Sequence, residues 1–319
     1  WCYFPDTKSG RKVGNRTVRN PLSKTIEQIK PSGIRKFFDI VSEMPHAISL
    51  GVGEPDFDTP WHVRSEGIRS LEKGRTFYTS NSGLIELRQE ICKWYQRKYN
   101  VLYDYKTEAL LTVGGSEGID VALRAMLDPG DEVIIPEPCY VSYVPCVQLI
   151  GAVPVTIELK NENQFRLTSE ELLAAITDKT KILILAFPSN PTGAVMTKED
   201  LEPIAKICQE KDIYVISDEI YSELTYGGQK HCSISSLPGM KERTIVINGF
   251  SKAYAMTGWR LGYALAPEVI AHQMTKIHQF AIMCAPTTSQ YAAIEAIKNG
   301  DADIEKMCKS YDQRRRFLL

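Results

Sequence analysis

The chain has 319 residues, of which 43% are hydrophobic and 24% are charged, an ordinary composition for a folded globular protein. Its 38 Lys and Arg residues almost balance 39 Asp and Glu residues, so the formal net charge is -1. A chain with so little net charge has no global positive field to hold nucleic acid or an anionic membrane surface. Apolar runs such as 182–187 are also too short to span a bilayer. We therefore expect no nucleic-acid partner and no membrane.

The cysteines and histidines do not form a metal-binding pattern. The 8 cysteines contain no CxxC pair, and the 5 histidines are equally scattered, so we expect no metal. Cysteines spread in this way are typical of reduced thiols, and Pro5 and Asp6 interrupt the N-terminal apolar stretch before a signal-peptide core forms. The sequence therefore predicts a cytoplasmic protein.

Both ends of the chain are unusual. Residues 1–20 are rich in Lys and Arg without apolar periodicity, which predicts a disordered or non-native leader. Residues 303–319 have helical periodicity but end on Phe317, Leu318 and Leu319 without a glycine cap or polar tail. This ending indicates that the chain is cut inside a longer protein.

From about residue 108 the sequence alternates strand-like and helix-like blocks. Strands are expected over 109–113, 132–135, 153–157, 182–187, 213–217, 244–248 and 260–266. Helices are expected over 114–127, from 141 onward, over 169–176 behind a Thr168 or Ser169 cap, and over 197–210. Residues 21–107 read as more helical. The alternation predicts an α/β fold with a mostly parallel sheet flanked by helices.

The candidate site lies at the carboxyl ends of these strands, where open α/β sheets bind their ligands. Gly114-Gly115-Ser116-Glu117-Gly118 follows a strand and opens a helix, so its backbone N–H groups can approach a phosphate. The segment matches neither GxGxxG nor the P-loop, and a plain turn between strand and helix is an equal alternative. Asn190 follows the strand 182–187 in a rigid Pro- and Gly-containing turn, which it either nucleates or uses to reach a ligand.

Charged side chains follow the next two strands. Asp218 ends an apolar strand, so its carboxylate would be partly buried and would need a cation, a metal or a protonated ring nitrogen, unless it only caps a helix. Lys252 follows the strand 244–248. An isolated lysine is usually a surface charge, but a lysine deprived of water becomes a nucleophile. Arg260, eight residues later, is able to hold a phosphate with two hydrogen bonds.

Taken together, these residue types match the chemistry of pyridoxal 5′-phosphate. Lys252 would form the Schiff base, and Asp218 would pair with the ring nitrogen and keep it protonated. The phosphate would be held by Gly115, Ser116 and Arg260. The ring hydroxyl would accept or donate hydrogen bonds with Asn190 and Tyr221.

The segments 189–193 (SNPTG), 217–221 (SDEIY) and 251–260 (SKAYAMTGWR) resemble the fold-type I, class I/II aminotransferases, the aspartate aminotransferase superfamily. Gly53–Phe57 and Tyr78-Thr79 extend the resemblance, which runs from about Pro21 to the last residue. Among members, the sequence is similar to the bacterial branch that includes N-acetyl-diaminopimelate, aspartate and aromatic aminotransferases.

The resemblance implies further roles. Tyr140 would stack on the cofactor, Ser251 and Glu117 would join the cofactor-binding residues, and Gly53 and Asn190 would bind substrate. Tyr78 would reach the phosphate of a partner subunit, which implies a homodimer. Behind the leader at 1–20, the resemblance implies three parts of the chain. These are an N-terminal small-domain segment or arm at 21–60, the cofactor-binding large domain at 61–298 and the start of a truncated small domain at 299–319. The family's substrate-carboxylate arginine would lie beyond residue 319, so the resemblance leaves the activity of this chain open.

The implied function is transamination, in which an amino group moves from an L-amino acid to a 2-oxo acid, within amino acid metabolism and biosynthesis. Three alternatives stay open. One is another reaction of the same cofactor, such as β-elimination by a C–S lyase or decarboxylation, which the fold does not separate from transamination. The second is a catalytically dead cofactor-binding protein. The third is a nicotinamide-dependent oxidoreductase, against which the lack of GxGxxG argues.

Overall fold

The computed structural model describes residues 12–13, 16–17, 19–31, 40, 43–44, 46 and 53–319. The chain divides into two units, residues 1–47 and residues 48–319. Most of the predicted leader at 1–20 lies outside the described residues. The first unit contains the antiparallel pair β1 (Lys12–Val13) and β2 (Arg16–Thr17) and the helix α1 (Lys24–Gln28). The predicted domain boundaries at residues 60 and 298 both fall inside the second unit.

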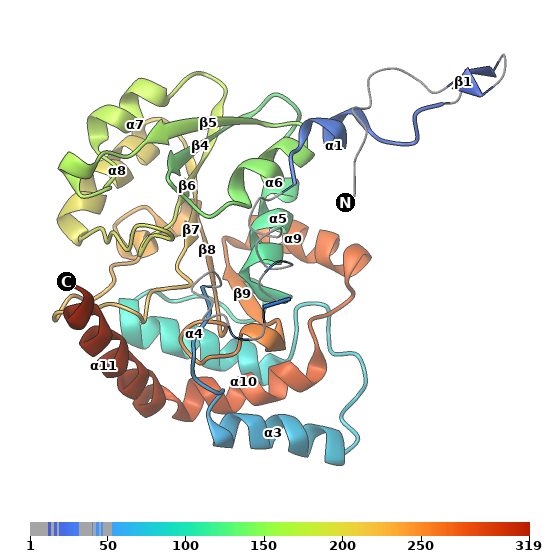
Figure 1. Cartoon of the computed structure of the whole chain (residues 1–319), viewed down its shortest axis with the longest axis vertical. Coiled ribbons are helices and arrows are strands. Elements are labelled where there is room, and N and C mark those ends of the chain that lie inside the picture. Colours follow the sequence, from blue (N-terminus) through green and yellow to red (C-terminus); the bar gives the residue numbers. More distant parts are fainter. Residues whose placement is uncertain are drawn as a thin grey trace. The chain divides into compact units, whose positions relative to one another are not determined.

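A seven-stranded sheet in the order β3-β9-β8-β7-β6-β4-β5 forms the centre of the second unit (Figure 1). Its strand β9 runs antiparallel to both neighbours, and the other neighbouring strands pair in parallel. This arrangement confirms the predicted mostly parallel sheet. The strands are β3 (Ala109–Thr112), β4 (Glu132–Glu137), β5 (Val153–Glu158), β6 (Thr180–Leu185), β7 (Tyr214–Asp218), β8 (Thr244–Gly249) and β9 (Gly262–Leu265).

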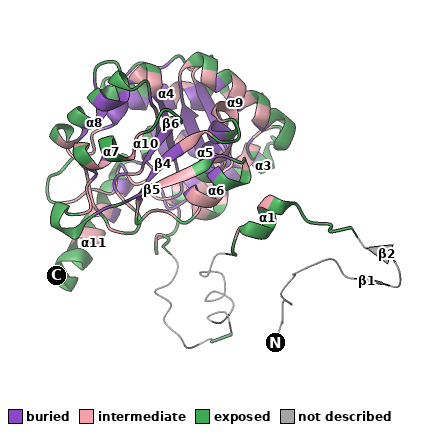
Figure 2. Cartoon of the chain, turned by 90° about the horizontal axis from the view of Figure 1, so that it is seen from above, coloured by how far each residue is buried: buried purple, intermediate pink, exposed green. Residues whose placement is uncertain are grey.

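Helices cover both faces of this sheet. One face packs against α5 (Gly114–Met126), α6 (Tyr143–Leu149) and α9 (Glu268–Ala281). The opposite face packs near β3 against α4 (Ile85–Tyr99) and α10 (Thr287–Asn299), with α3 (Trp61–Glu72) and α11 (Asp301–Leu318) outside them. Near β5 that face packs against α7 (Ser169–Ala175) and α8 (Lys198–Glu210). Figure 2 shows the buried strands enclosed by helices whose outer surfaces are exposed.

Successive side chains of a strand point to opposite faces of the sheet. Because helices cover both faces, the central strands are apolar on both sides. In β6, Ile182 and Ile184 join the core on the α5 side, and Leu183 and Leu185 join the core on the α8 side. The same alternation continues in β7 and decides which way the polar residues at its end point.

Local capping sets the start of two helices, as the sequence predicts. Thr168 and Thr197 each accept a hydrogen bond from the third residue of the helix, whose carboxylate bonds back to the threonine N–H. The helix expected from residue 141 begins at Tyr143. In the described part of the chain, no helix is both long and apolar enough to cross a membrane.

His62 on α3 ties together three helices. Its Nδ1 lies 2.8 Å from Glu295 of α10, and its Nε2 lies 2.9 Å from Asp303 of α11. Burial lowers the pKa of His62, but the hydrogen bonds and charges of the two carboxylates outweigh this, so the pKa lies above its ordinary value of 6.5. A group whose pKa is higher in the folded than in the unfolded protein stabilises the fold fully at a pH below its unfolded-state pKa. This stabilisation is lost as the pH rises through its folded-state pKa.

We therefore expect His62→Gln to lower the melting temperature by about 2 °C at about pH 5 and by less at about pH 9. Differential scanning calorimetry of both proteins at both pH values measures this difference. An equal loss at the two pH values would contradict the role of the protonated imidazole.

Candidate active site

Four of the predicted site residues lie at one edge of the sheet. Asn190, Asp218 and Lys252 follow or end the parallel strands β6, β7 and β8. Arg260 precedes β9, and the start of an antiparallel strand lies at the same edge as the ends of its parallel neighbours. The β9 direction therefore brings Arg260 to the edge that carries the other three residues.

Lys252 is a partly buried lysine directed at the N-terminal part of the second unit. Its Nζ donates a hydrogen bond to the carbonyl oxygen of Gly53 and lies 5.7 Å from the centre of the Tyr221 ring. Burial lowers the pKa of Lys252; the nearby Glu54 opposes this shift, and Arg260 adds to it. An amine with a lowered pKa is more often neutral, which is the nucleophilic form.

Asp218 is a buried carboxylate whose hydrogen-bond donors are both neutral. Its Oδ2 accepts from the Tyr143 hydroxyl at 2.7 Å, and its Oδ1 accepts from the backbone N–H of Ile220 at 3.2 Å. Burial raises the pKa of Asp218, the two hydrogen bonds lower it, and the charge of Glu219 raises it further. Tyr143 carries no signal in the sequence that marks it as a site residue. It belongs to α6, and only the packing of that helix on the sheet brings it to Asp218.

Tyr221 lies near Asp218 and connects to Asn190 and Tyr140. Burial raises the pKa of Tyr221, as do the nearby Asp218 and Tyr140, whereas a hydrogen bond with Asn190 lowers it. The Tyr140 ring centre lies 5.6 Å from that of Tyr143 in an edge-on arrangement. These contacts bring Asn190, Tyr221 and Tyr140 together.

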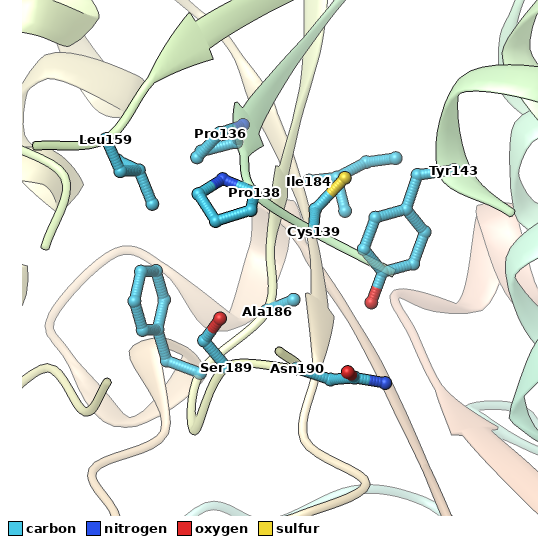
Figure 3. Close-up of a pocket in the computed structure, with 10 residues that line it drawn as sticks. Pro136, Pro138, Cys139, Tyr143, Leu159, Ile184, Ala186, Ser189 and Asn190 are labelled. Atoms are coloured by element: carbon cyan, nitrogen blue, oxygen red, sulfur yellow. The ribbon is translucent and has the colours of Figure 1, made fainter. Parts of the chain in front are cut away.

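A small pocket lies beside Tyr143 and Asn190. Figure 3 shows Tyr143 and Asn190 lining this pocket together with Pro136, Cys139 and Ser189. Its volume is about 10 Å³, which is room for no more than a single water molecule. The site is therefore packed closely from behind.

The start of α5 and Arg260 form a cradle for an anion. A Cβ added to Gly114 would lie 2.6 Å from Nη2 of Arg260, so the guanidinium reaches directly over the first turn of the helix. N–H groups in the first turn have no carbonyl partner inside the helix and favour a negative charge. Gly115 and Ser116 lie in that turn, and Ser251 is buried beside Lys252. These groups could together hold a phosphate.

The side chain of Glu117 is held by groups of the protein itself. Its Oε2 accepts a hydrogen bond from the backbone N–H of Val113, and its Oε1 lies 2.6 Å from Nδ1 of the buried His278. Because both carboxylate oxygens are bound within the protein, Glu117 fixes the start of α5 and does not offer its side chain to a ligand. A Glu in the first helical turn commonly bonds back to the cap N–H, so this alternative is visible in the sequence.

Gly262 keeps this cradle open. A Cβ at this position would lie 2.7 Å from the backbone C of Gly114 and from the backbone N of Gly115. Backbone atoms do not move aside easily, so we expect Gly262→Ala to displace the start of α5 and to weaken binding of a phosphate-bearing ligand about tenfold or more. Equilibrium titration followed by absorbance measures the affinity. Gly258→Ala is the matched control, since a Cβ there meets nothing within 4 Å. Equal affinity of both variants would contradict this role.

A cavity of about 630 Å³ opens in front of Lys252 and Tyr221. Its walls include Gly53 and Glu54, the turn that contains Ser189 and Gly193, and Tyr226, Tyr311 and Arg315. This volume lies in the range of small-molecule sites. The carbonyl of Gly53 faces Lys252.

Tyr78 lies apart from this cluster. Its side chain is 80% exposed, as is that of the adjacent Phe77. The segment is fixed to the start of α10 by the Thr287 hydroxyl, which donates to the Phe77 carbonyl at 2.8 Å. Within one chain, Tyr78 therefore points to solvent instead of joining the other predicted residues.

The donor set fits pyridoxal phosphate. The start of α5 and Arg260 suit its phosphate, the buried Asp218 with its neutral donors suits a protonated ring nitrogen, and the partly desolvated Lys252 suits its aldehyde. This combination at the edge of an α/β sheet defines a pyridoxal phosphate-dependent enzyme.

Comparison with known proteins identifies the family. The model of the family "Aminotransferase class I and II" matches residues 45–319, and the chain belongs to this family. The Bacillus subtilis protein YugH is 52% identical over 93% of the chain and 77% of its own length. Aspartate aminotransferase of Pyrococcus abyssi is 45% identical, and aromatic-amino-acid aminotransferase 2 of Thermococcus litoralis is 44% identical, each over 93% of the chain and 77% of that protein.

Solved structures agree with the sequence relatives. An aromatic aminotransferase from Pyrococcus horikoshii has a TM-score of 0.84 at 45% identity, over 89% of the chain and 76% of that structure. A Thermus thermophilus aspartate aminotransferase double mutant has a TM-score of 0.89 at 37% identity, over 94% of the chain and 79% of that structure. The predicted fold, cofactor and transaminase activity are confirmed, and the alternative functions are not favoured.

Proposed function

We propose that Lys252 is the residue that attaches pyridoxal phosphate and moves the proton in transamination. The observation that carries this proposal is the position of its partly desolvated amine at the sheet edge that also carries Asp218 and Arg260. When bound, pyridoxal phosphate supplies an electron sink for the bonds of the substrate α-carbon. Nζ of Lys252 takes the proton from that carbon and holds it, and its lowered pKa makes the neutral, accepting form more abundant.

The other residues bind and orient the cofactor. Asp218 holds the proton on the ring nitrogen, and the Tyr143 hydroxyl fixes the orientation of its carboxylate. Asn190 and Tyr221 bind the ring hydroxyl, and Tyr140 packs against the ring. The first turn of α5, Ser251 and Arg260 bind the phosphate. Gly53 and Asn190 contact the substrate.

We also propose a homodimer in which Tyr78 reaches the phosphate of the neighbouring subunit. Large apolar side chains are exposed around the Tyr78 segment, namely Phe77, Phe280, Ile282 and Met283. The Asn81 amide donates to the Met283 carbonyl at 2.9 Å, which joins the two segments that carry these side chains. An exposed apolar patch of this kind is typical of an interface. Sedimentation at a mass of twice 35.9 kDa is the expected result.

For the amino donor we propose aspartate and aromatic amino acids as the first candidates, because similar proteins carry those names. The cavity before Lys252 has both apolar walls, such as Leu224, and the cationic Arg315. We further propose a cytoplasmic location and a role in amino acid biosynthesis. Unpaired cysteines throughout the described residues support the location.

The test of the proposed site is attachment of the cofactor. The protein is mixed with pyridoxal phosphate, its visible spectrum is recorded, and borohydride is added before peptide mapping by mass spectrometry. We expect an absorption band that borohydride bleaches and a phosphopyridoxyl group on Lys252. Attachment to another lysine, or no attachment in the folded protein, would overturn the assignment.

A further inference from the structure

Glu219, the residue after Asp218, is a carboxylate that the proposed mechanism does not use. It is completely buried, with no exposed surface. Its backbone N–H donates to the Ile247 carbonyl at 2.8 Å, so it continues the pairing of β7 with β8. Because side chains alternate along a strand, Asp218 points to the α6 side and Glu219 points to the opposite side, toward α4.

A ring of hydroxyl groups surrounds the Glu219 carboxylate. Its Oε1 accepts from Ser217 at 3.1 Å and from Ser233 at 2.5 Å. The Tyr95 hydroxyl, which has one proton, lies 3.1 Å from Oε2 and 2.6 Å from Oγ of Ser233. Ser235 bonds to both Tyr95 and Ser233 and closes the network. An ionised carboxylate only accepts hydrogen bonds, whereas a protonated one must donate one. A carboxylate surrounded by hydroxyl groups that can donate to it is suited to the ionised form.

Among the described residues, a single imidazole is the candidate cation that faces Glu219. The nearest cationic candidate is Nε2 of His231, 3.4 Å from Oε2, and it lies outside hydrogen-bonding geometry. No Lys or Arg side chain of the described residues forms an ion pair with Glu219, in contrast to Glu223, which lies 2.6 Å from Lys98. The remaining titratable neighbours are neutral phenols and a thiol or a like charge, namely Tyr95, Tyr99, Tyr103, Tyr263, Cys232 and Asp218.

We propose that Glu219 is a second, buried negative charge behind Asp218 that helps Asp218 to hold a proton on the ring nitrogen of the bound cofactor. Two carboxylates on opposite faces of one strand end place the nitrogen in a more negative potential than Asp218 alone would. The raised pKa of Asp218, to which the Glu219 charge contributes, has the same sign. Glu219 is thus a positioning residue, since it acts through Asp218. The inference rests on the proposed role of Asp218.

The test measures the proton on the ring nitrogen directly. Wild-type protein and Glu219→Gln are loaded with pyridoxal phosphate that carries an isotope-labelled ring nitrogen, and its chemical shift is followed by NMR through a pH titration. Glutamine keeps the size of the side chain and loses the charge. We expect the titration midpoint of the ring nitrogen to fall by about one pH unit or more in Glu219→Gln. Glu219→Asp, which keeps the charge, should restore most of the difference.

Glu223→Gln is the matched control, because it removes a carboxylate from the same segment whose charge Lys98 already neutralises. It should titrate at the wild-type pH. If Glu219→Gln does not fold, Glu219→Leu combined with Ser233→Ala removes the charge together with its closest donor and leaves fewer unpaired groups. Thermal unfolding measures the stability of each variant. A purely structural role of Glu219 would lower the stability without moving the titration midpoint of the ring nitrogen.

The outcomes for this inference and for the proposed function differ. Failure of the wild-type protein to attach the cofactor at Lys252 would count against the proposed site as a whole. A folded, loaded Glu219 variant whose ring nitrogen titrates at the wild-type pH would overturn the inference alone.

Discussion

Lys252→Ala should abolish attachment of pyridoxal phosphate and lower the transamination rate by about 10⁴-fold. The substitution removes both the amine that binds the cofactor covalently and the group that moves the α-proton. Asp218, Arg260 and the start of α5 remain, so the variant should still bind the phosphate and ring of the cofactor, but reversibly. Borohydride trapping followed by mass spectrometry measures attachment, and formation of the new amino acid measures the rate.

The matched control is Lys206→Ala. Lys206 lies on α8 with a side chain 77% exposed, so its loss should change neither attachment nor rate. A Lys252→Ala protein that transaminates at the wild-type rate would show that another residue moves the proton.

Asp218→Asn should lower kcat/KM by about 10²-fold to 10³-fold. The amide has the shape of the carboxylate and still accepts the Tyr143 hydrogen bond, but it carries no charge to hold a proton on the ring nitrogen. Attachment to Lys252 should persist, because the aldehyde and phosphate contacts are untouched. Steady-state kinetics with the donor and acceptor pair that the wild-type protein uses measures the loss.

Asp131→Asn provides the comparison within the same sheet. Asp131 precedes β4 at the opposite edge and pairs with Lys181 at 3.0 Å, so its loss should leave kcat/KM near the wild-type value. An Asp218→Asn protein with more than about a tenth of wild-type kcat/KM would contradict the role of the buried charge.

Most of the fold is predictable from the sequence because the central strands are short apolar runs and two of the helices begin at a capping box. Thr197 and Asp200 illustrate this, since they form the predicted cap. The direction of β9 is not predictable in the same way. Residues 262–265 are apolar and buried on both faces, and such a run fits a parallel or an antiparallel neighbour equally well.

The residues of the candidate site also differ in whether the sequence predicts them. Asn190, Asp218 and Lys252 are recognisable because each is a polar residue at the end of an apolar strand or in the turn that follows it. Tyr143 is not recognisable, because its contact with Asp218 spans 75 positions in the chain and depends on how α6 packs. Glu219 is hidden for a related reason, since its hydroxyl partners come from α4 and from the segment before Ile234.

The antiparallel direction of β9 also affects which parts of the site can loosen independently. Lys252 and Arg260 lie in the short connection between the adjacent strands β8 and β9, so they come together through local contacts. Asp218 and Asn190 are separated from this connection and from each other by helical crossovers between parallel strands. A ligand held by all of them bridges segments that would otherwise loosen independently. Loading with pyridoxal phosphate should therefore protect this edge of the sheet from proteolysis and amide exchange as one cooperative unit.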